Sequence, residues 1–144
     1  MISNIGVLVI LINQKSQVLL AKRKNAYGAG TWGCPGGRFA DLENIDQCVK
    51  RELMEEAGLI PKQWRLLGVV KEWQETKFFV HFIVVCTDWK GLVALKEPNK
   101  SEPWHWFDLN RLPEPILIGH KKGIELYLSE KQSKSSTSNW FVEI

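Results

Sequence analysis

Apolar and polar residues alternate in blocks along the first part of the chain. Residues 5–13 are rich in Val, Ile and Leu and predict a strand buried on both faces. The polar residues at 13–16 predict a turn, and residues 17–22 (QVLLAK) are typical of the strand that returns from it. We therefore expect the chain to open with a β-hairpin.

A spacing of four residues replaces the strand pattern after residue 44. Apolar residues recur at this interval from Ile45 to Leu53, which predicts a helix with one stripe facing the core. Asn44 and Gln47 have the spacing of a capping box that would start the helix at residue 45. Gly58 fits the C-terminal end. The rest of the helix surface is free to present polar groups.

The second half of the sequence contains further strands and one more helix. Residues 77–86 are aromatic and β-branched throughout, the strongest strand pattern in the chain. Around them we expect a strand within 61–70, a turn at 72–76, a loop or edge strand at 92–98, a loop at 99–104, a short strand at 106–108 and a helix at 119–129. With no repeat or internal linker, the pattern predicts one α/β (α+β) domain over residues 1–130. Residues 131–144 form a tail, in which the Ser- and Lys-rich part 131–139 is expected to be mobile and the aromatic residues at 140–142 could dock.

Length and composition agree with a single globular domain. The chain has 144 residues, of which 44% are hydrophobic and 24% charged. The apolar run at 5–12 is too short for a transmembrane helix and has no basic region before it, so it predicts neither a span nor a signal peptide. We expect a cytoplasmic protein that does not bind a membrane.

Charge and cysteine content narrow the function classes further. A net charge of +3 is too small to indicate binding to a nucleic-acid polymer, although it is compatible with attracting small anions. The cysteines Cys34, Cys48 and Cys86 are odd in number and lack a paired metal-binding spacing. They are expected to be reduced thiols.

Acidic residues concentrate on the first predicted helix. Glu52, Glu55 and Glu56 have the spacing that places side chains on one helical face. Like charges this close repel one another, so a merely solvated helix would be better served by interleaved lysines. The concentration of carboxylates therefore predicts a site for a hard divalent cation.

These acids stand inside a longer motif. The fixed positions G-x5-E-x7-R-E-U-x-E-E-x-G-U, with U a bulky aliphatic residue, are matched without insertion by Gly37, Glu43, Arg51, Glu52, Leu53, Glu55, Glu56, Gly58 and Leu59. Through this motif the chain resembles the Nudix hydrolases. The segments GTWGCPGG before it and EPWHWFDLNRLP after it are similar as well. The resemblance implies the Nudix fold, a mixed β-sheet sandwiched between α-helices.

The resemblance also implies a reaction and a set of metal ligands. Nudix enzymes cleave a nucleoside diphosphate linked to another group, by attack of water on phosphorus. By position, Glu52, Glu55 and Glu56 would bind Mg²⁺ or Mn²⁺, with the backbone carbonyl of Gly36 as a further ligand. One of the helix glutamates, or a group outside the helix, would act as the base.

Other residues of the motif are expected to support this centre. Arg51 would orient the acids, and Glu43 would bond the helix start or the arginine. Glu102 is either an added ligand or base, or an exposed loop residue. Many family members have Glu and Gly where this chain has Ala40 and Leu42, which leaves the number of metal ions and the loop geometry open.

The substrate-binding groups are less sharply defined. Lys22 and Arg23 precede a glycine-bearing loop and are either a solvated strand end or holders of phosphate oxygens. Gly37 would lie against the substrate. Phe79 and Trp104, with other aromatic residues, are candidates for stacking on a base, although such residues more often belong to a core. His81 is expected to be a core or strand-face histidine, and His105 and His120 have no partner in the sequence that suggests catalysis.

Three functions follow from the resemblance. The short chain is similar to MutT-type members that convert nucleoside triphosphates to a monophosphate and pyrophosphate. The alternatives are a hydrolase of another diphosphate, such as a nucleotide sugar or ADP-ribose, and a catalytically silent module that binds nucleotide or protein. The intact acids argue against the silent module. Homodimers are frequent in the family, so the resemblance also allows a homodimer.

Overall fold

Strand β1 (Ile5–Leu11) lies inside the main sheet because both of its edges are occupied. It pairs in parallel with β6 (Lys77–Lys90) and antiparallel with β4 (Gly36–Arg38). The computed structural model describes residues 4–24, 27–132 and 140–144. The remaining elements are β2 (Gln17–Lys22), β3 (Trp32–Gly33), α1 (Ile45–Ala57), β5 (Ile60–Gln74), β7 (His105–Asp108), α2 (Ile118–Gln132) and β8 (Phe141–Glu143).

The strands form two sheets, and this overturns the predicted opening hairpin. One sheet has the order β4-β1-β6-β5-β8, and the other has the order β3-β2-β7. The turn after β1 is present, but the described pairing next to it is only an isolated bridge between Ile12, just beyond β1, and Val18 of β2. The prediction was wrong because β4 and β6 already use both edges of β1, so β2 pairs with β3 and β7 instead.

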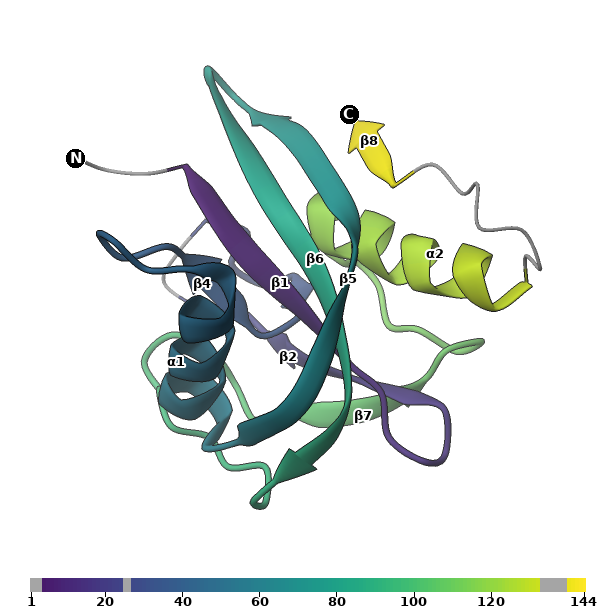
Figure 1. The fold of residues 1–144 in the computed structure, drawn as a ribbon. Coiled ribbons are helices and arrows are strands. Elements are labelled where there is room, and N and C mark those ends of the chain that lie inside the picture. Colours follow the sequence, from purple (N-terminus) through teal and green to yellow (C-terminus); the bar gives the residue numbers. More distant parts are fainter. Residues whose placement is uncertain (1–3, 25–26, 133–139) are drawn as a thin grey trace.

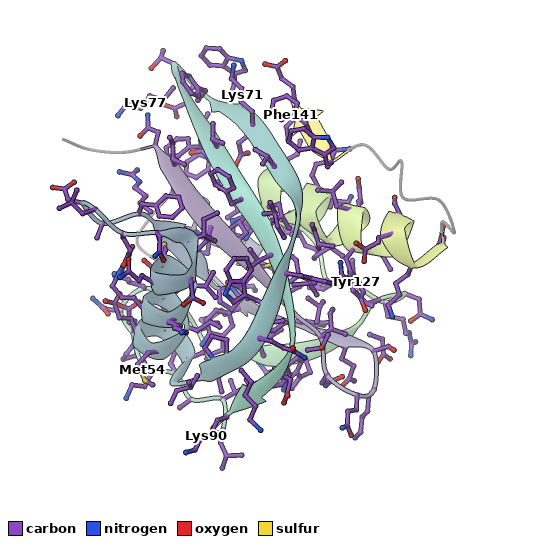
Figure 2. All side chains as sticks on the ribbon, in the orientation of Figure 1. Met54, Lys71, Lys77, Lys90, Tyr127 and Phe141 are labelled. Atoms are coloured by element: carbon purple, nitrogen blue, oxygen red, sulfur yellow. The ribbon has the colours of Figure 1, made fainter. Side chains whose placement is uncertain are left out.

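The larger sheet is covered on both faces, as the resemblance implied. Alternate residues of β1 point to opposite sides: Val7 and Val9 belong to the core under α1, whereas Leu8 and Ile10 belong to the core under α2. The two helices lie on opposite sides of the sheet (Figure 1). Tyr127 of α2 packs into the second of these cores (Figure 2). The mixed α+β sandwich is confirmed.

Helix α1 begins and ends where its local signals place it. The side chain of Asn44 accepts a hydrogen bond from the backbone N–H of Gln47 at 2.8 Å, and the side chain of Gln47 accepts one from the N–H of Asn44 at 2.9 Å. Gly58 ends the helix in the left-handed conformation, with φ 70°. Val49 and Leu53 are fully buried, which anchors the helix and fixes the direction of its acidic side.

The hairpin of β5 and β6 is longer than predicted. The expected turn at 72–76 is wrong at its start, because Glu72 is paired in register with Phe79 and the turn is confined to Glu75 and Thr76. Glu72 is polar but only 3% exposed, because it faces inward and bonds His81. The pattern of polar residues did not reveal this hydrogen bond between a buried carboxylate and a histidine.

The C-terminal end of the chain adds an edge strand to the main sheet. β8 pairs in parallel with β5, with Val70 opposite Val142. The segment 92–98 is a loop, and α2 covers the expected 119–129 and extends to Gln132. Part of the tail predicted to be mobile, residues 133–139, lies outside the described residues. In the ranges that the structure describes, no helix is both long and apolar enough to cross a membrane.

Candidate active site

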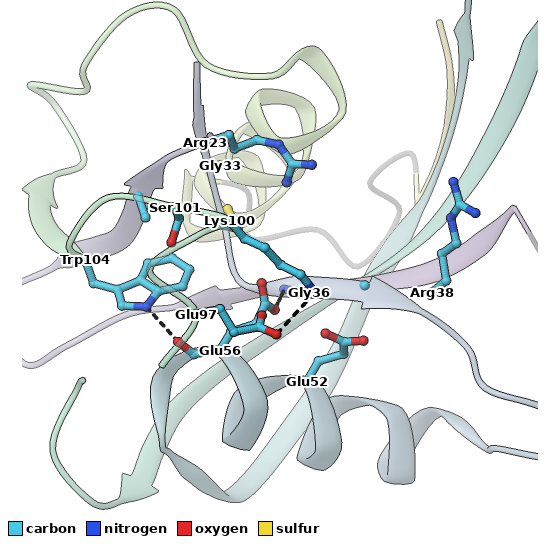
Figure 3. A pocket seen from close by; sticks show the side chains of 13 residues that line it. Arg23, Gly33, Gly36, Arg38, Glu52, Glu56, Glu97, Lys100, Ser101 and Trp104 are labelled. Carbon is cyan, nitrogen blue, oxygen red and sulfur yellow. Dashed lines mark hydrogen bonds and ion pairs between the residues drawn. The ribbon is translucent and has the colours of Figure 1, made fainter. Parts of the chain in front are cut away.

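A cavity of about 450 Å³ lies beside the acidic side of α1. Its walls come from the end of β2, from β3 and β4, from α1 and from the loop that precedes β7. Glu52 and Glu56 enter it from the helix, and Glu97 enters it from the loop (Figure 3). The motif therefore contributes two of its carboxylates to one enclosed space.

The carboxylates of Glu52 and Glu56 are close enough to repel each other. Burial raises the pKa of Glu56 well above its usual range, and the charge of Glu52 adds to this. Burial also raises the pKa of Glu52. The backbone N–H of Gly36 donates to Oε1 of Glu56 at 2.8 Å. A Cβ atom added at Gly37 would lie 2.4 Å from Oε1 of Glu52, so this position accommodates only glycine beside the carboxylate as it lies.

Arg51 lies behind these acids and connects them to the loop before the helix. Its Nε and Nη2 donate to both carboxylate oxygens of Glu43, at 2.6 and 2.9 Å. Its Nη1 donates to Glu52 at 2.9 Å and to Glu55 at 3.2 Å, and Nη2 also donates to the carbonyl of Arg38 at 2.9 Å. The guanidinium holds the pKa of Glu43 down at about 2. This geometry agrees with the supporting parts expected of Arg51 and Glu43.

The other predicted acidic ligands do not face the cavity. Glu55 is exposed and bonds Arg51, and Glu102 is exposed in the loop before β7. In the described part of the chain, no three His, Cys, Asp or Glu side chains are already arranged to hold a metal ion. Glu97 faces the cavity and bonds Nζ of Lys100 at 3.2 Å. Sequence reasoning missed Glu97 because a single acid in an irregular loop has no spacing that marks it.

The opposite wall of the cavity is basic. Arg23 and Arg38 line it, and no described carboxylate forms an ion pair with either one. Nε of Arg23 donates to the carbonyl of Tyr27 at 2.9 Å, which fixes the direction of the side chain. Burial lowers the pKa of Arg23, although the guanidinium stays charged. Lys22 is outside the lining, with Nζ 5.6 Å from the ring centroid of Trp32.

A second cavity, of about 210 Å³, adjoins the first and shares five lining residues with it. They are Arg23, Cys34, Gly36, Gly37 and Arg38. Its own residues include Phe79, whose ring lies 5.3 Å below the guanidinium of Arg38. Trp104 lies instead in the first cavity, where its Nε1–H donates to the carbonyl of Glu56 at 3.1 Å. Phe79 and Trp104, the two residues predicted to stack on a base, therefore line different cavities.

Comparison with known proteins decides the family. The model of the NUDIX domain matches residues 3–127. This chain belongs to the Nudix family. The Nudix signature and the fold thus agree, and the prediction of the family is confirmed.

Relatives of this Nudix chain include hydrolases with different substrates. It is 36% identical over 122 residues to an ADP-ribose pyrophosphatase of Methanocaldococcus jannaschii, covering 84% of this chain and 71% of the relative. It is 34% identical over 107 residues to an oxidized purine nucleoside triphosphate hydrolase of Danio rerio, covering 73% and 67%. A crystal structure of a MutT NUDIX hydrolase from Burkholderia pseudomallei matches with TM-score 0.82 and 30% identity, covering 88% and 98%. This Nudix protein is therefore a pyrophosphatase.

Proposed function

We propose that the protein hydrolyses a nucleoside triphosphate to a nucleoside monophosphate and pyrophosphate, with Mg²⁺ as its metal and Mn²⁺ as a substitute. The observation that carries the proposal is the pairing of the two cavities. The first has carboxylates on one wall and, on the other, Arg23 and Arg38, which form no ion pair with a described carboxylate; a polyphosphate chain with its metal ion requires both charges. The second adjoins it and is smaller, as suits one nucleoside.

The residues of the first cavity fit a divalent cation. Glu52 and Glu56 bring carboxylate oxygens, the ligands that Mg²⁺ prefers, and the charge of Glu52 still raises the pKa of Glu56, so a cation between them would be favoured. Glu55 and the carbonyl of Gly36 are the further ligands that the family signature implies. When bound, Mg²⁺ would neutralise phosphate charge and make the phosphorus a better electrophile.

The protein's own groups have separate parts in the reaction. Arg51 holds Glu52 in place at 2.9 Å, and the N–H of Gly36 holds Glu56 at 2.8 Å. Arg23 meets the phosphate oxygens from the opposite wall. A carboxylate with a raised pKa, such as that of Glu52, is suited to accept the proton of the attacking water.

A second candidate is a hydrolase of ADP-ribose or a nucleotide sugar. The 36% identity to an ADP-ribose pyrophosphatase, over 84% of this chain, favours it. Such a substrate has a second sugar in place of the terminal phosphate, and that sugar would have to share the acidic and basic first cavity. We therefore rank it below the triphosphate.

The two candidates differ in the products they release. The purified protein is incubated with nucleoside triphosphates, ADP-ribose and nucleotide sugars in Mg²⁺, in Mn²⁺ and in chelator, and the products are separated by chromatography. We expect pyrophosphate and monophosphate from triphosphates, and none in chelator. Turnover of ADP-ribose or sugar nucleotides alone would refute the first candidate. No turnover of any substrate in either metal would favour a silent binding module.

A further inference from the structure

The second cavity contains a histidine whose tautomer is fixed by the backbone. The N–H of Cys34 donates to Nδ1 of His120 at 2.8 Å, so Nδ1 has no proton and Nε2 carries it. The residue at 33 must be small here, because a Cβ at Gly33 would lie 3.1 Å from that Nδ1. His120 is only 6% exposed, and burial lowers its pKa well below the usual range, so the ring stays neutral. His120 is therefore a hydrogen-bond donor only at Nε2.

This donor is open to the cavity. None of the described residues accepts a hydrogen bond from Nε2 of His120. At the same time, no fully buried side-chain nitrogen or oxygen of the described residues lacks a partner. Nε2 must therefore have accessible surface, and the cavity lined by His120 supplies it. Water in the cavity can accept this proton in the free protein, and an acceptor group of a bound ligand can take the place of that water.

His81 offers a second polar ring edge beside it. Its Nε2 lies 2.6 Å from Oε1 of Glu72, and a carboxylate can only accept, so Nε2 carries a proton. The other ring nitrogen, Nδ1, forms no hydrogen bond with a described residue. The ring centroids of His81 and His120 are 6.2 Å apart, so neighbouring atoms on the edge of one base can meet both rings.

The two rings lie next to groups of opposite charge. The positive guanidinium of Arg23 acts on His120, whereas the carboxylate of Glu72 lies against His81. A carbonyl oxygen carries more negative charge than an unprotonated ring nitrogen, and the N–H beside it is correspondingly positive. An oxo group at His120 can accept the proton of Nε2 and is attracted by Arg23, whereas an amino group at the same place would bring a second donor against that N–H.

We propose that His120 is a specificity-determining residue that donates from Nε2 to an oxo group of the base, so that the enzyme prefers 6-oxopurine nucleotides to 6-aminopurine nucleotides. This deepens the proposed function and rests on it. One net hydrogen bond corresponds to roughly a tenfold preference. Phe79, parallel to His81 at 6.4 Å between centroids, gives the base an aromatic neighbour.

Two measurements on the wild-type protein test the proposal. The first is the dissociation constants of IMP and AMP by calorimetry, which need no turnover. The second is kcat/KM for ITP and ATP in Mg²⁺. We expect IMP and ITP to be favoured by about tenfold. Equal binding of IMP and AMP, tighter binding of AMP, or binding of neither would overturn the proposal. Preference for IMP without hydrolysis of any triphosphate would refute the proposed function alone, and hydrolysis without preference would refute the inference alone.

Variants of His120 distinguish the effect of losing the hydrogen-bond donor from the effect of disturbing the fold. His120→Asn keeps an acceptor for the N–H of Cys34 but removes the donor at Nε2, so the preference is expected to fall to within about threefold of unity. His120→Gln places an amide donor near Nε2 and should restore part of it. His105→Asn, at an exposed histidine outside both cavities, should keep the full preference. A full preference in His120→Asn, or a nuclear magnetic resonance spectrum of wild type with the His120 proton on Nδ1, would contradict the assignment.

Discussion

Replacing Glu43 by Gln removes one charge from the pair that holds Arg51 while keeping the shape of the side chain. In the wild type both carboxylate oxygens accept from Arg51, at 2.6 and 2.9 Å, and the N–H of Ala40 donates to Oε1 at 2.9 Å. The hydrogen bond from Arg51 is the largest cause of the lowered pKa of Glu43. The carboxylate is therefore bound more tightly than its neutral form, and its loss should cost stability.

The size of this loss follows from the pKa. A fall from the ordinary 4.5 to about 2 corresponds to about 3 kcal/mol as an upper limit. The side chains of Glu43 and Arg51 are 10% and 32% exposed, so solvent screens part of their attraction. We expect Glu43→Gln to lower the free energy of unfolding by about 1–2 kcal/mol at pH 7.

The dependence on pH is specific to a carboxylate with a lowered pKa. Its stabilisation is fully present above the pKa of the unfolded chain and is lost as pH falls towards the folded pKa of about 2. Urea denaturation at pH 7, 5 and 3 measures it, and the difference between wild type and Glu43→Gln should fall below half its full size by about pH 3. Glu125→Gln is the control, because that residue forms only an exposed pair with Lys122. Equal stability of Glu43→Gln and wild type at pH 7, or an undiminished difference at pH 3, would refute this reasoning.

Three further substitutions test separate parts of the structure. Gly37→Ala would place Cβ 2.4 Å from Oε1 of Glu52. We therefore expect kcat to fall about tenfold or more, with little change in melting temperature. An unchanged kcat would show that Glu52 can move freely. Gly68→Ala would place Cβ 2.3 Å from the backbone carbonyl that precedes β8. It should destabilise the protein by about 1–3 kcal/mol in urea without changing KM, and unchanged stability would argue against β8 on this edge. Glu55→Gln is expected to lower turnover at least about a hundredfold if the family signature assigns it correctly as a ligand, whereas a near wild-type rate would remove it from the ligand set.

The helix that presents the acids could be predicted closely because its signals are local. The capping box at Asn44 and Gln47, the apolar spacing and the stop at Gly58 all lie within the segment they control. Partner choice among strands is not local. The turn between β1 and β2 was visible in the sequence, but the strands that compete for the edges of β1 lie far along the chain.

The residues of the candidate site also fall into those that a local motif marks and those that only folding brings together. Glu52 and Glu56 were found because a motif of fixed spacing contains them. Glu97, His81 and His120 come from a loop, a strand and a helix that only the folded chain brings together. Each appears singly in the sequence, among residues that give no reason to choose it. The reaction class was therefore predictable, whereas the groups that we propose to meet the base were not.

The most direct test of the central claim is the rate of pyrophosphate release by Glu56→Gln. Glu56 lines the first cavity beside Glu52, and the amide would keep the shape of the side chain but lose its charge. With a nucleoside triphosphate and Mg²⁺, we expect turnover to fall at least about a hundredfold while binding of the nucleoside monophosphate and the unfolding transition stay close to wild type. A Glu56→Gln protein that released pyrophosphate at a near wild-type rate would contradict the account.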